Sequence, residues 1–173
     1  MIDISLLIKC IRDEFGSIPF PSHCGLHAAM AKDDWIEDQV KLKEITRSKD
    51  YIGHWWEVPL EQLLSCRLAL SYLDADGIEF YLPAYMVAVV EHPIAFDRPQ
   101  VSSSWEIVHL MTPDNNNQEL RAYFHERFSK IIGGKRRACR DFLVYVSASS
   151  HYDEYASHLA KDALTSNFWL TDS

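Results

Sequence analysis

The chain of 173 residues carries 17 basic and 25 acidic side chains, a formal net charge of −8, and 47% of its residues are hydrophobic. This composition is typical of a folded protein and argues against a disordered one. We expect a single domain, 1–173, because a chain of this length buries about 70% of its unfolded surface and needs no disulfide or metal as a staple.

The charge is distributed unevenly along the chain. Residues 1–117 carry 9 basic and 18 acidic side chains, whereas residues 118–141 carry 7 and 3. An acidic body repels nucleic acids and anionic membranes and attracts basic partners. We therefore expect a basic protein partner, no nucleic acid and no membrane, with solubility alone as the other explanation of the acidity.

The sequence shows no sign of a membrane span or of an oxidising compartment. Its longest apolar run, 80–90, has about half of the roughly 20 residues that cross a bilayer. The N-terminal stretch opens with an acid, so we interpret it as a helix rather than a signal peptide. The four cysteines are far apart and form no C-x-x-C pair, which favours reduced thiols and a cytoplasmic location.

The first third of the chain predicts one amphipathic helix followed by charged ones. Apolar residues recur with a helical period over 2–15, where Asp3 is placed to cap the helix and Gly16 to end it. Over 25–47 the apolar spacing is imperfect and many residues are charged. We expect one or two exposed helices there, covering the core.

Two core helices are expected at the centre of the chain. Pro59 and Pro83 each precede an apolar segment and suit the first position of a helix, which predicts helices over 59–73 and 83–90. Two aspartates and a glycine within 74–77 predict the turn between these helices.

A β-strand is the alternative for residues 85–90, Tyr-Met-Val-Ala-Val-Val. Aromatic and β-branched residues, which dominate this segment, are enriched in strands. We prefer a helix because the chain offers no second strand of similar quality to pair with it.

The second half of the chain also predicts helices. Ser103 and Glu106 have the spacing of a capping box, which predicts a helix that extends to Met111. The apolar tail that contains Phe168 and Trp169 is expected to dock on the body. The whole pattern predicts an all-α fold, a compact single-domain bundle of about seven helices. Further helices are expected over 118–128, 134–146 and 150–164.

The sequence offers no recognisable catalytic motif. It lacks a nucleophile elbow, a Gly-rich dinucleotide loop and a P-loop. His23-Cys24-x-x-His27 places two histidines at the spacing of metal ligands on a helix, but partner ligands at a matching spacing are missing. We interpret these histidines as surface or capping residues and expect no catalytic residue, no metal and no cofactor.

Asp74, Asp76 and Glu79 form the one carboxylate cluster that would suit an enzyme. Paired carboxylates beside apolar residues, here Phe80 and Tyr81, are how general acid and base sites are built. The other interpretation is structural, with Asp74 and Asp76 building a turn and Glu79 capping the next segment.

A basic cluster lies between residues 130 and 140. Its charges could contact nucleic acid, but the acidity of the rest of the chain favours internal pairing or solvation. The cluster consists of Lys130, Lys135, Arg136, Arg137 and Arg140.

Two segments are candidates for contact with a protein partner. Trp56 and Glu57 follow His54 and Trp55, and aromatic residues of this kind anchor interfaces. Packing of Trp55 or Trp56 in the core is the other interpretation. The second segment is acidic and suits a basic protein, but a solvated helix face is the usual and preferred interpretation of such a run of charges. It contains Asp33, Asp34, Glu37 and Asp38.

Four different short motifs follow one another along the chain. They are Trp56-x-Val58-Pro59, Leu70-x-x-Leu73, Phe80-Tyr81-Leu82-Pro83-Ala84-Tyr85 and Cys139-x-x-Phe142-Leu143-x-Tyr145. With them the chain resembles an uncharacterised bacterial domain-of-unknown-function family that shares a W-x-x-P, YLPAY and FL-x-Y pattern. The resemblance implies a small helical bacterial protein and assigns no catalytic residue.

The sequence thus favours non-enzymatic protein binding. An acidic protein of this kind suits an immunity-type role, in which it neutralises a basic toxin domain by direct binding. One alternative is a small enzyme with its site near Asp74, Asp76 and Glu79. Another is an oligomer-forming subunit with an apolar surface at Phe168 and Trp169.

Overall fold

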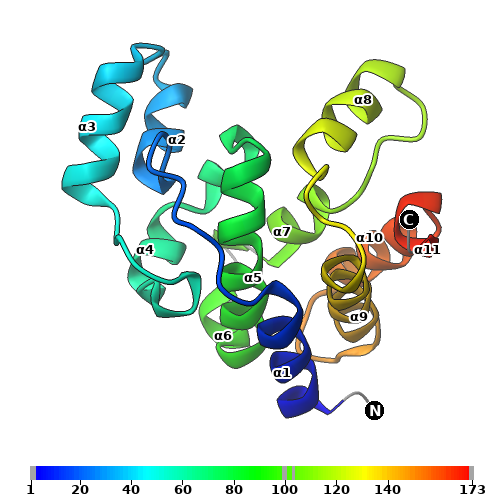
Figure 1. The fold of residues 1–173 in the computed structure, drawn as a ribbon. Helices are drawn as coiled ribbons and strands as arrows, with labels where there is room; N and C mark the ends of the chain where they lie inside the picture. The colour runs from blue at the N-terminus through cyan, green and yellow to red at the C-terminus, as the bar shows by residue number, and fades with distance from the viewer. Residues whose placement is uncertain (1–2, 99–100, 103, 172–173) are drawn as a thin grey trace.

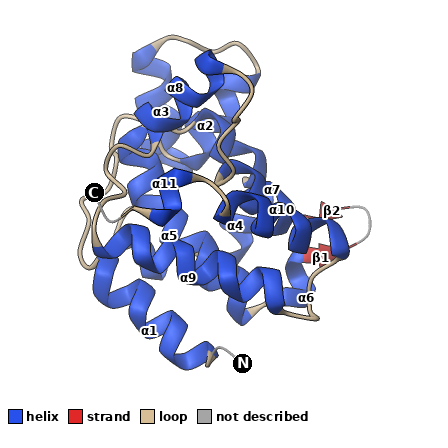
Figure 2. Cartoon of the chain, turned by 90° about the vertical axis from the view of Figure 1, so that its right-hand side faces the viewer, coloured by secondary structure: helices blue, strands red, loops and turns tan. Residues whose placement is uncertain are grey.

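Helices provide nearly all regular structure in the computed structural model, which describes residues 3–98, 101–102 and 104–171 (Figure 1). The predicted all-α fold is confirmed. Two short antiparallel strands, β1 (Asp97–Arg98) and β2 (Val101–Ser102), lie beside α6 (Figure 2). The helices, with η for 3₁₀ segments, are α1 (Ile4–Phe15), α2 (Leu26–Asp33), α3 (Gln39–Lys49), η1 (Trp55–Glu57), α4 (Leu60–Ser65), η2 (Arg67–Tyr72), α5 (Ala75–Glu91), α6 (Pro93–Phe96), α7 (Ser104–Leu110), α8 (Gln118–Arg127), α9 (Gly134–Ala148), α10 (Glu154–Leu164) and α11 (Asn167–Leu170).

Helix α5 lies at the centre of the fold, with α2, α3 and α4 on one side and α8 to α11 on the other (Figure 1). Its residues from Phe80 to Val90 are all buried. A helix that is apolar all round is expected to be buried on every side. The helical interpretation of 85–90 is therefore confirmed. Among the described residues, neither α5 nor any other helix has the length and apolarity that a membrane crossing needs.

Pro83 lies inside α5 and does not begin it, so this part of the sequence prediction is wrong. The helix begins earlier, at the cap Asp74, whose Oδ1 accepts the N–H of Gly77 at 3.0 Å. Residues 74–77 therefore form a cap and a first turn rather than a link between helices. An internal proline costs about 3 kcal/mol. Burial of each large apolar side chain contributes about 1.5–3 kcal/mol, so burial along α5 outweighs that cost.

The helix predicted over 59–73 is divided at Cys66 into α4 and η2. The guanidinium of Arg127, on α8, donates to the carbonyls of Leu70 and Leu73. Because a side chain replaces backbone amides as the donor, this segment can tighten into a 3₁₀ helix. The described residues form eleven α-helical and two 3₁₀ segments instead of about seven helices, because of this division and because of short helices such as α6 and α11 that were not predicted.

The N-terminal helix α1 is confirmed together with both of its ends. Oδ1 of Asp3 accepts the N–H of Ser5 at 2.8 Å and that of Leu6 at 3.3 Å, and Gly16 ends the helix at a φ of 53°. Helix α1 packs against α5 and α9. Of the two helices that follow, α3 is largely exposed as predicted, whereas α2 is largely buried.

The C-terminal tail docks on the body as predicted. Phe168 and Trp169 are buried in α11, and Nε1 of Trp169 donates to the carbonyl of Met111 at 2.8 Å. Both rings contact Phe124 and Phe128 of the α8 region. Since these rings are enclosed, they do not provide the exposed apolar surface that an oligomer-forming subunit would use.

The helices of the second half match the predicted segments closely. Helix α7 begins at Ser104, and α8, α9 and α10 follow where they were expected. Ser103, the predicted cap of α7, lies outside the described residues. Glu106, the other member of the predicted capping box, lines a cavity.

Candidate partner-binding surface

The predicted acidic segment forms the connection between α2 and α3, which we call the acidic turn (33–38). All four of its carboxylate residues are exposed. Asp38 is the N-cap of α3, where its Oδ1 accepts the N–H of Val40 at 2.8 Å and that of Lys41 at 3.3 Å. Asp33 accepts the hydroxyl of Tyr72. Asp33 and Asp38 therefore also hold the turn in place.

Trp35 is the most exposed large apolar residue of the acidic turn, at 86%. Its N–H donates to the carbonyl of Lys32 at 3.0 Å, and the N–H of Ile36 donates to that of Ala31 at 3.1 Å. These bonds form the Schellman motif, with Trp35 in the left-handed position that glycine usually occupies. Its φ is 61°. Because a bulky residue in this region is strained by about 1–2 kcal/mol, the turn keeps a tryptophan at a cost to stability.

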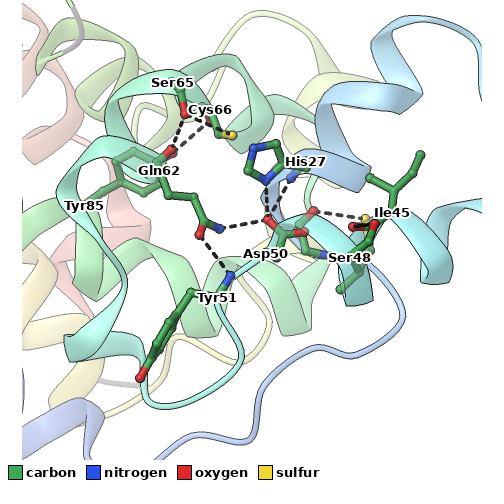
Figure 3. A network of polar contacts seen from close by, with 12 residues as sticks. His27, Ile45, Ser48, Asp50, Tyr51, Gln62, Ser65, Cys66 and Tyr85 are labelled. Carbon is green, nitrogen blue, oxygen red and sulfur yellow. Dashed lines mark hydrogen bonds and ion pairs between the residues drawn. The ribbon is translucent and has the colours of Figure 1, made fainter.

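A buried polar network fixes the base of the α2–α3 pair (Figure 3). The Asp50 side chain is fully buried at the end of α3. Its Oδ1 accepts the N–H of His27 at 3.0 Å, His27 Nδ1 at 2.8 Å and Gln62 Nε2 at 2.8 Å. The network therefore ties α2, α3 and α4 together at the end of α3 opposite the acidic turn.

Gly25 allows this network to be compact. A Cβ at Gly25 would lie 2.1 Å from Oδ2 of Asp50, well inside contact distance. The N–H of Gly25 donates to Oγ1 of Thr46 at 2.9 Å, which joins the start of α2 to α3 a second time.

Trp56 and Glu57 lie in η1, away from the acidic turn. Helix α3 separates the two sets of residues, and its length of 11 residues spans roughly 16 Å (Figure 1). The structure therefore does not bring the two predicted sets together. Trp56 exposes 42% of its surface and stacks on His54, with ring centroids 4.3 Å apart. Trp55, in contrast, is buried, and its Nε1 donates to the carbonyl of Gly16 at 2.8 Å.

Glu57 is held by its own loop. Its Oε2 accepts the hydroxyl of Tyr51 at 2.8 Å and the N–H of His54 at 3.4 Å. These hydrogen bonds lower the pKa of Glu57 because they favour the charged carboxylate. The carboxylate is exposed, but it is already engaged within the chain.

Each carboxylate of the enzyme alternative contacts a basic side chain. Asp74 lies 2.6 Å from Nε2 of His23, Asp76 pairs with Lys130, and Glu79 pairs with Lys135. Burial raises the pKa of Asp74, but hydrogen bonds from the Gly77 backbone and from His23 outweigh burial and lower it overall. A general acid at neutral pH needs the opposite shift.

The basic cluster pairs internally, as the sequence predicted. Besides the lysine pairs, Arg137 lies 3.4 Å from Oε1 of Glu14. Arg136 is buried, donates to the carbonyl of Ile131 at 3.2 Å and lies 4.2 Å above the ring of Phe168. These charges therefore serve the fold.

The two histidines with metal-like spacing contact different carboxylates. His23 contacts Asp74, whereas His27 contacts Asp50. Within the described part of the chain, no three or more His, Cys, Asp or Glu side chains gather as a metal site would require.

Sequence reasoning did not single out Trp35 as an exposed residue with a left-handed backbone. Its position in a broken helical pattern suggested packing, as for the other apolar residues of that segment. Helices often end with a glycine in the left-handed conformation, and this helix has Trp35 at that position after Asp33 and Asp34. The tryptophan in place of a glycine was the signal in the sequence.

One comparison with known proteins gives a match. The sequence model of a family of unknown function (DUF6714) matches residues 3–173. No curated protein and no solved structure matches the chain.

Proposed function

We propose that this chain, which belongs to a protein family of unknown function (DUF6714), is a non-enzymatic module. Its acidic turn binds a basic protein. The partner class that fits is a toxin domain. In this role the chain is an immunity-type protein, which neutralises the toxin by covering its basic surface.

Trp35 is the observation that carries the proposal. It exposes 86% of its surface in a backbone conformation that glycine would adopt at lower cost. Tryptophan is among the residues most enriched in binding hot spots, where truncation costs about 2 kcal/mol or more. A strained and exposed tryptophan is therefore better explained by binding than by folding.

The charges around Trp35 support a basic partner. Asp34 and Glu37 flank the ring in sequence and are exposed on the same turn. Carboxylates at the rim of an interface accelerate association with a basic surface and select against acidic competitors. The net charge of −8 also attracts a basic partner at long range.

A cytoplasmic location is part of the same proposal. The four cysteines are free thiols, and three of them are buried. Free thiols in this number are typical of a reducing compartment. An immunity-type protein in the cytoplasm protects the cell that makes its cognate toxin.

Capture of a partner by the immobilised full chain tests the proposal. From a lysate of the native host, the chain is expected to retain one basic protein in stoichiometric amount. Trp35→Ala is expected to weaken this binding by about 30-fold, or 2 kcal/mol. Leu6→Ala is the control, because Leu6 is another exposed apolar residue, on α1, and its truncation should leave binding unchanged.

A second variant tests the contribution of the charges around Trp35 separately from that of Trp35 itself. Asp34→Asn with Glu37→Gln removes two charges and spares Asp33 and Asp38, which hold the turn. We expect association slower by about tenfold at low salt and a smaller effect at high salt. Glu119→Gln with Asp162→Asn, at exposed positions on α8 and α10, is the control with equal charge loss.

Growth assays complete the test. The captured protein, expressed alone, is expected to arrest growth, and co-expression of the chain is expected to restore it. Three results would contradict the proposal: no stoichiometric partner, a partner that binds the Trp35 variant as tightly as the wild type, or a partner that is harmless when expressed alone.

A further inference from the structure

A cavity opens between η2, α7 and α8. Its volume of about 500 Å³ is large enough for a big side chain or a small molecule. Residues from three elements line it, with Arg67 and Leu68 from η2, Trp105 and Glu106 from α7, and Leu120 from α8. The cavity is thus a feature of the tertiary fold and not of one loop.

A second hollow, which we call the cleft, lies at the other end of η2, between α2 and α8 (Figure 1). Its volume is also about 500 Å³. Lys32 of α2, Tyr72 of η2, Asp76 of α5 and Glu126 of α8 are among the residues that line it. The cleft therefore separates the acidic turn and its helices from α8.

The cavity and the cleft form one continuous groove. Tyr123 and Arg127 of α8 line both of them. On the opposite side, η2 lines the cavity as far as Ser71 and the cleft from Tyr72 onward. The groove therefore follows η2, whose six residues span about 12 Å.

The cleft end of the groove adjoins the acidic turn. Lys32, which lines the cleft, directly precedes the turn in the sequence. The hydroxyl of Tyr72, which also lines the cleft, donates to Asp33 of the turn. A protein that covers the acidic turn therefore lies next to the open groove.

The cavity end of the groove is apolar at its mouth. Leu68, Leu120 and Tyr123 all line the cavity, and each is about half exposed. Isolated apolar residues on a surface need no explanation, but apolar residues gathered around one hollow are typical of an interaction site. This end of the groove suits a large apolar side chain.

The cleft between these two ends is balanced in charge, because as many basic as acidic residues line it. Its basic residues are engaged within the chain. Nζ of Lys32 donates to the carbonyl of Tyr72 at 3.3 Å. Lys130 pairs with Asp76, and Arg127 donates to two backbone carbonyls. The cleft therefore suits the uncharged middle of a bound segment.

The acidic turn alone is too small for a stable interface. A typical interface takes about 20–30 residues and about 800 Å² from each partner. The turn, 33–38, offers only a fraction of this surface. A partner bound at Trp35 therefore covers more of the chain, and the groove is the hollow that adjoins the turn.

We propose that this groove binds an extended segment of the basic partner, with basic residues at the acidic turn and one large apolar side chain in the cavity. The inference rests on the proposed function and identifies the part of the partner that is recognised. Four extended residues, at about 3.3 Å each, cover the length of η2. The apolar side chain therefore lies at least about four positions from the basic residues.

Substitutions at Leu120 test the cavity end, by titration of purified full-length variants with the captured basic protein. Leu120→Glu is expected to weaken binding by at least about tenfold. The added carboxylate by itself would attract a basic partner, so this loss reports the missing apolar contact. Leu120→Met, which keeps an apolar side chain of similar volume, should bind as the wild type does.

Leu6→Glu is the matched control. It makes the same chemical change at another exposed leucine, on α1, and should leave the affinity unchanged. Because Leu120 is half exposed, urea denaturation of Leu120→Glu should give a wild-type transition, which separates a loss of binding from a loss of folding.

Selection of displayed random peptides on the immobilised full chain tests the groove without the partner. Peptides of about 12 residues are long enough to span it. We expect the enriched peptides to carry two or more Lys or Arg and, at least about four positions away, a Leu, Phe or Trp. They should bind Leu120→Glu and Trp35→Ala at least about tenfold more weakly than the wild type or Leu6→Glu.

The outcomes separate this inference from the proposed function. A partner that loses affinity in Trp35→Ala but keeps it in Leu120→Glu supports the proposed function and overturns the groove. A partner that depends on both residues but is harmless when expressed alone contradicts the immunity role and supports the groove. If no partner is captured, the selection decides: peptides of the expected pattern that depend on Leu120 support the groove, and their absence overturns it.

Discussion

Two connections in this chain expose a tryptophan, and they do so for different reasons. In η1, Trp56 stacks on His54 and contacts the buried Trp55, so its position follows from the packing of its own loop. In the acidic turn, Trp35 exposes twice as large a fraction, 86% against 42%, and adopts a strained left-handed backbone. The difference identifies Trp35, and not Trp56, as the residue that folding does not explain.

The largest expected effect is at the buried tryptophan of η1. Trp55→Ala removes a fully enclosed ring and the hydrogen bond from Nε1 to the carbonyl of Gly16. We expect a loss of about 4 kcal/mol in the free energy of unfolding, measured by urea denaturation. A loss below about 1 kcal/mol would show that the η1 loop does not depend on this ring.

The second effect is at the base of the α2–α3 pair. Asp50→Ala leaves two donors of His27 and one of Gln62 without an acceptor inside the protein. A decrease of about 3 kcal/mol in the free energy of unfolding is expected. Asp50→Asn, which keeps one acceptor oxygen, should lose less, and equal losses would show that the hydrogen bonds contribute little.

The third effect has the opposite sign. Trp35→Gly relieves the left-handed strain, and we expect the free energy of unfolding to rise by about 1 kcal/mol, reduced somewhat by the greater freedom of glycine in the unfolded chain. Trp35→Ala keeps the strain and should leave stability nearly unchanged. Destabilisation by the glycine variant would mean that the exposed ring supports the fold after all.

A smaller effect is expected at the exposed tryptophan of η1. Trp56→Ala removes the stacking contact with His54 and an edge contact with Trp55, and aromatic contacts of this kind contribute about 0.5–1.5 kcal/mol. Urea denaturation should detect a loss of about 1 kcal/mol, and partner binding should remain. If Trp56→Ala instead removed binding, the contrast between the two tryptophans would fail.

The last prediction concerns the loss of stability at low pH. The folded pKa of Asp74 lies below the unfolded value near 3.8, so its contribution to stability is complete above that value and is lost as the pH falls through the folded pKa. We expect the free energy of unfolding to decrease below about pH 4. In Asp74→Asn this part of the decrease should be absent, and parallel curves for both proteins would refute the role of Asp74.

Much of the fold is predictable from the sequence because local signals agree with the packing. Asp3 and Gly16 mark both ends of α1, and the apolar run of α5 indicates a buried helix. The motif residues Tyr81 and Tyr85 are fully buried, as is Phe142 of α9. The YLPAY pattern is therefore a signature of the core and says little about function.

The errors arise where distant contacts override local patterns. Pro83 suggests a helix start, but the cap at Asp74 and burial on every side carry the helix through it. The 3₁₀ segment η2 receives hydrogen bonds at the carbonyls of Leu70 and Leu73 from Arg127, which lies on a helix more than 50 residues later. No pattern within one segment reveals a donor of that kind.

The candidate sites show the same limit. The exposure of the acidic residues of the turn was predicted, because charge is visible in the sequence. The exposure of Trp35 was not, because an apolar residue in a helical pattern usually packs. The cavity lined by Arg67, Glu106 and Leu120 could not be predicted, since three separate elements build it.

The most direct test of the binding role is the affinity of Trp35→Gly for the captured basic partner, measured by titration of purified proteins. We predict binding about 30-fold weaker than that of the wild type, in a protein that is itself more stable. Wild-type affinity in this variant would contradict the assignment of Trp35 as the anchor of the interface.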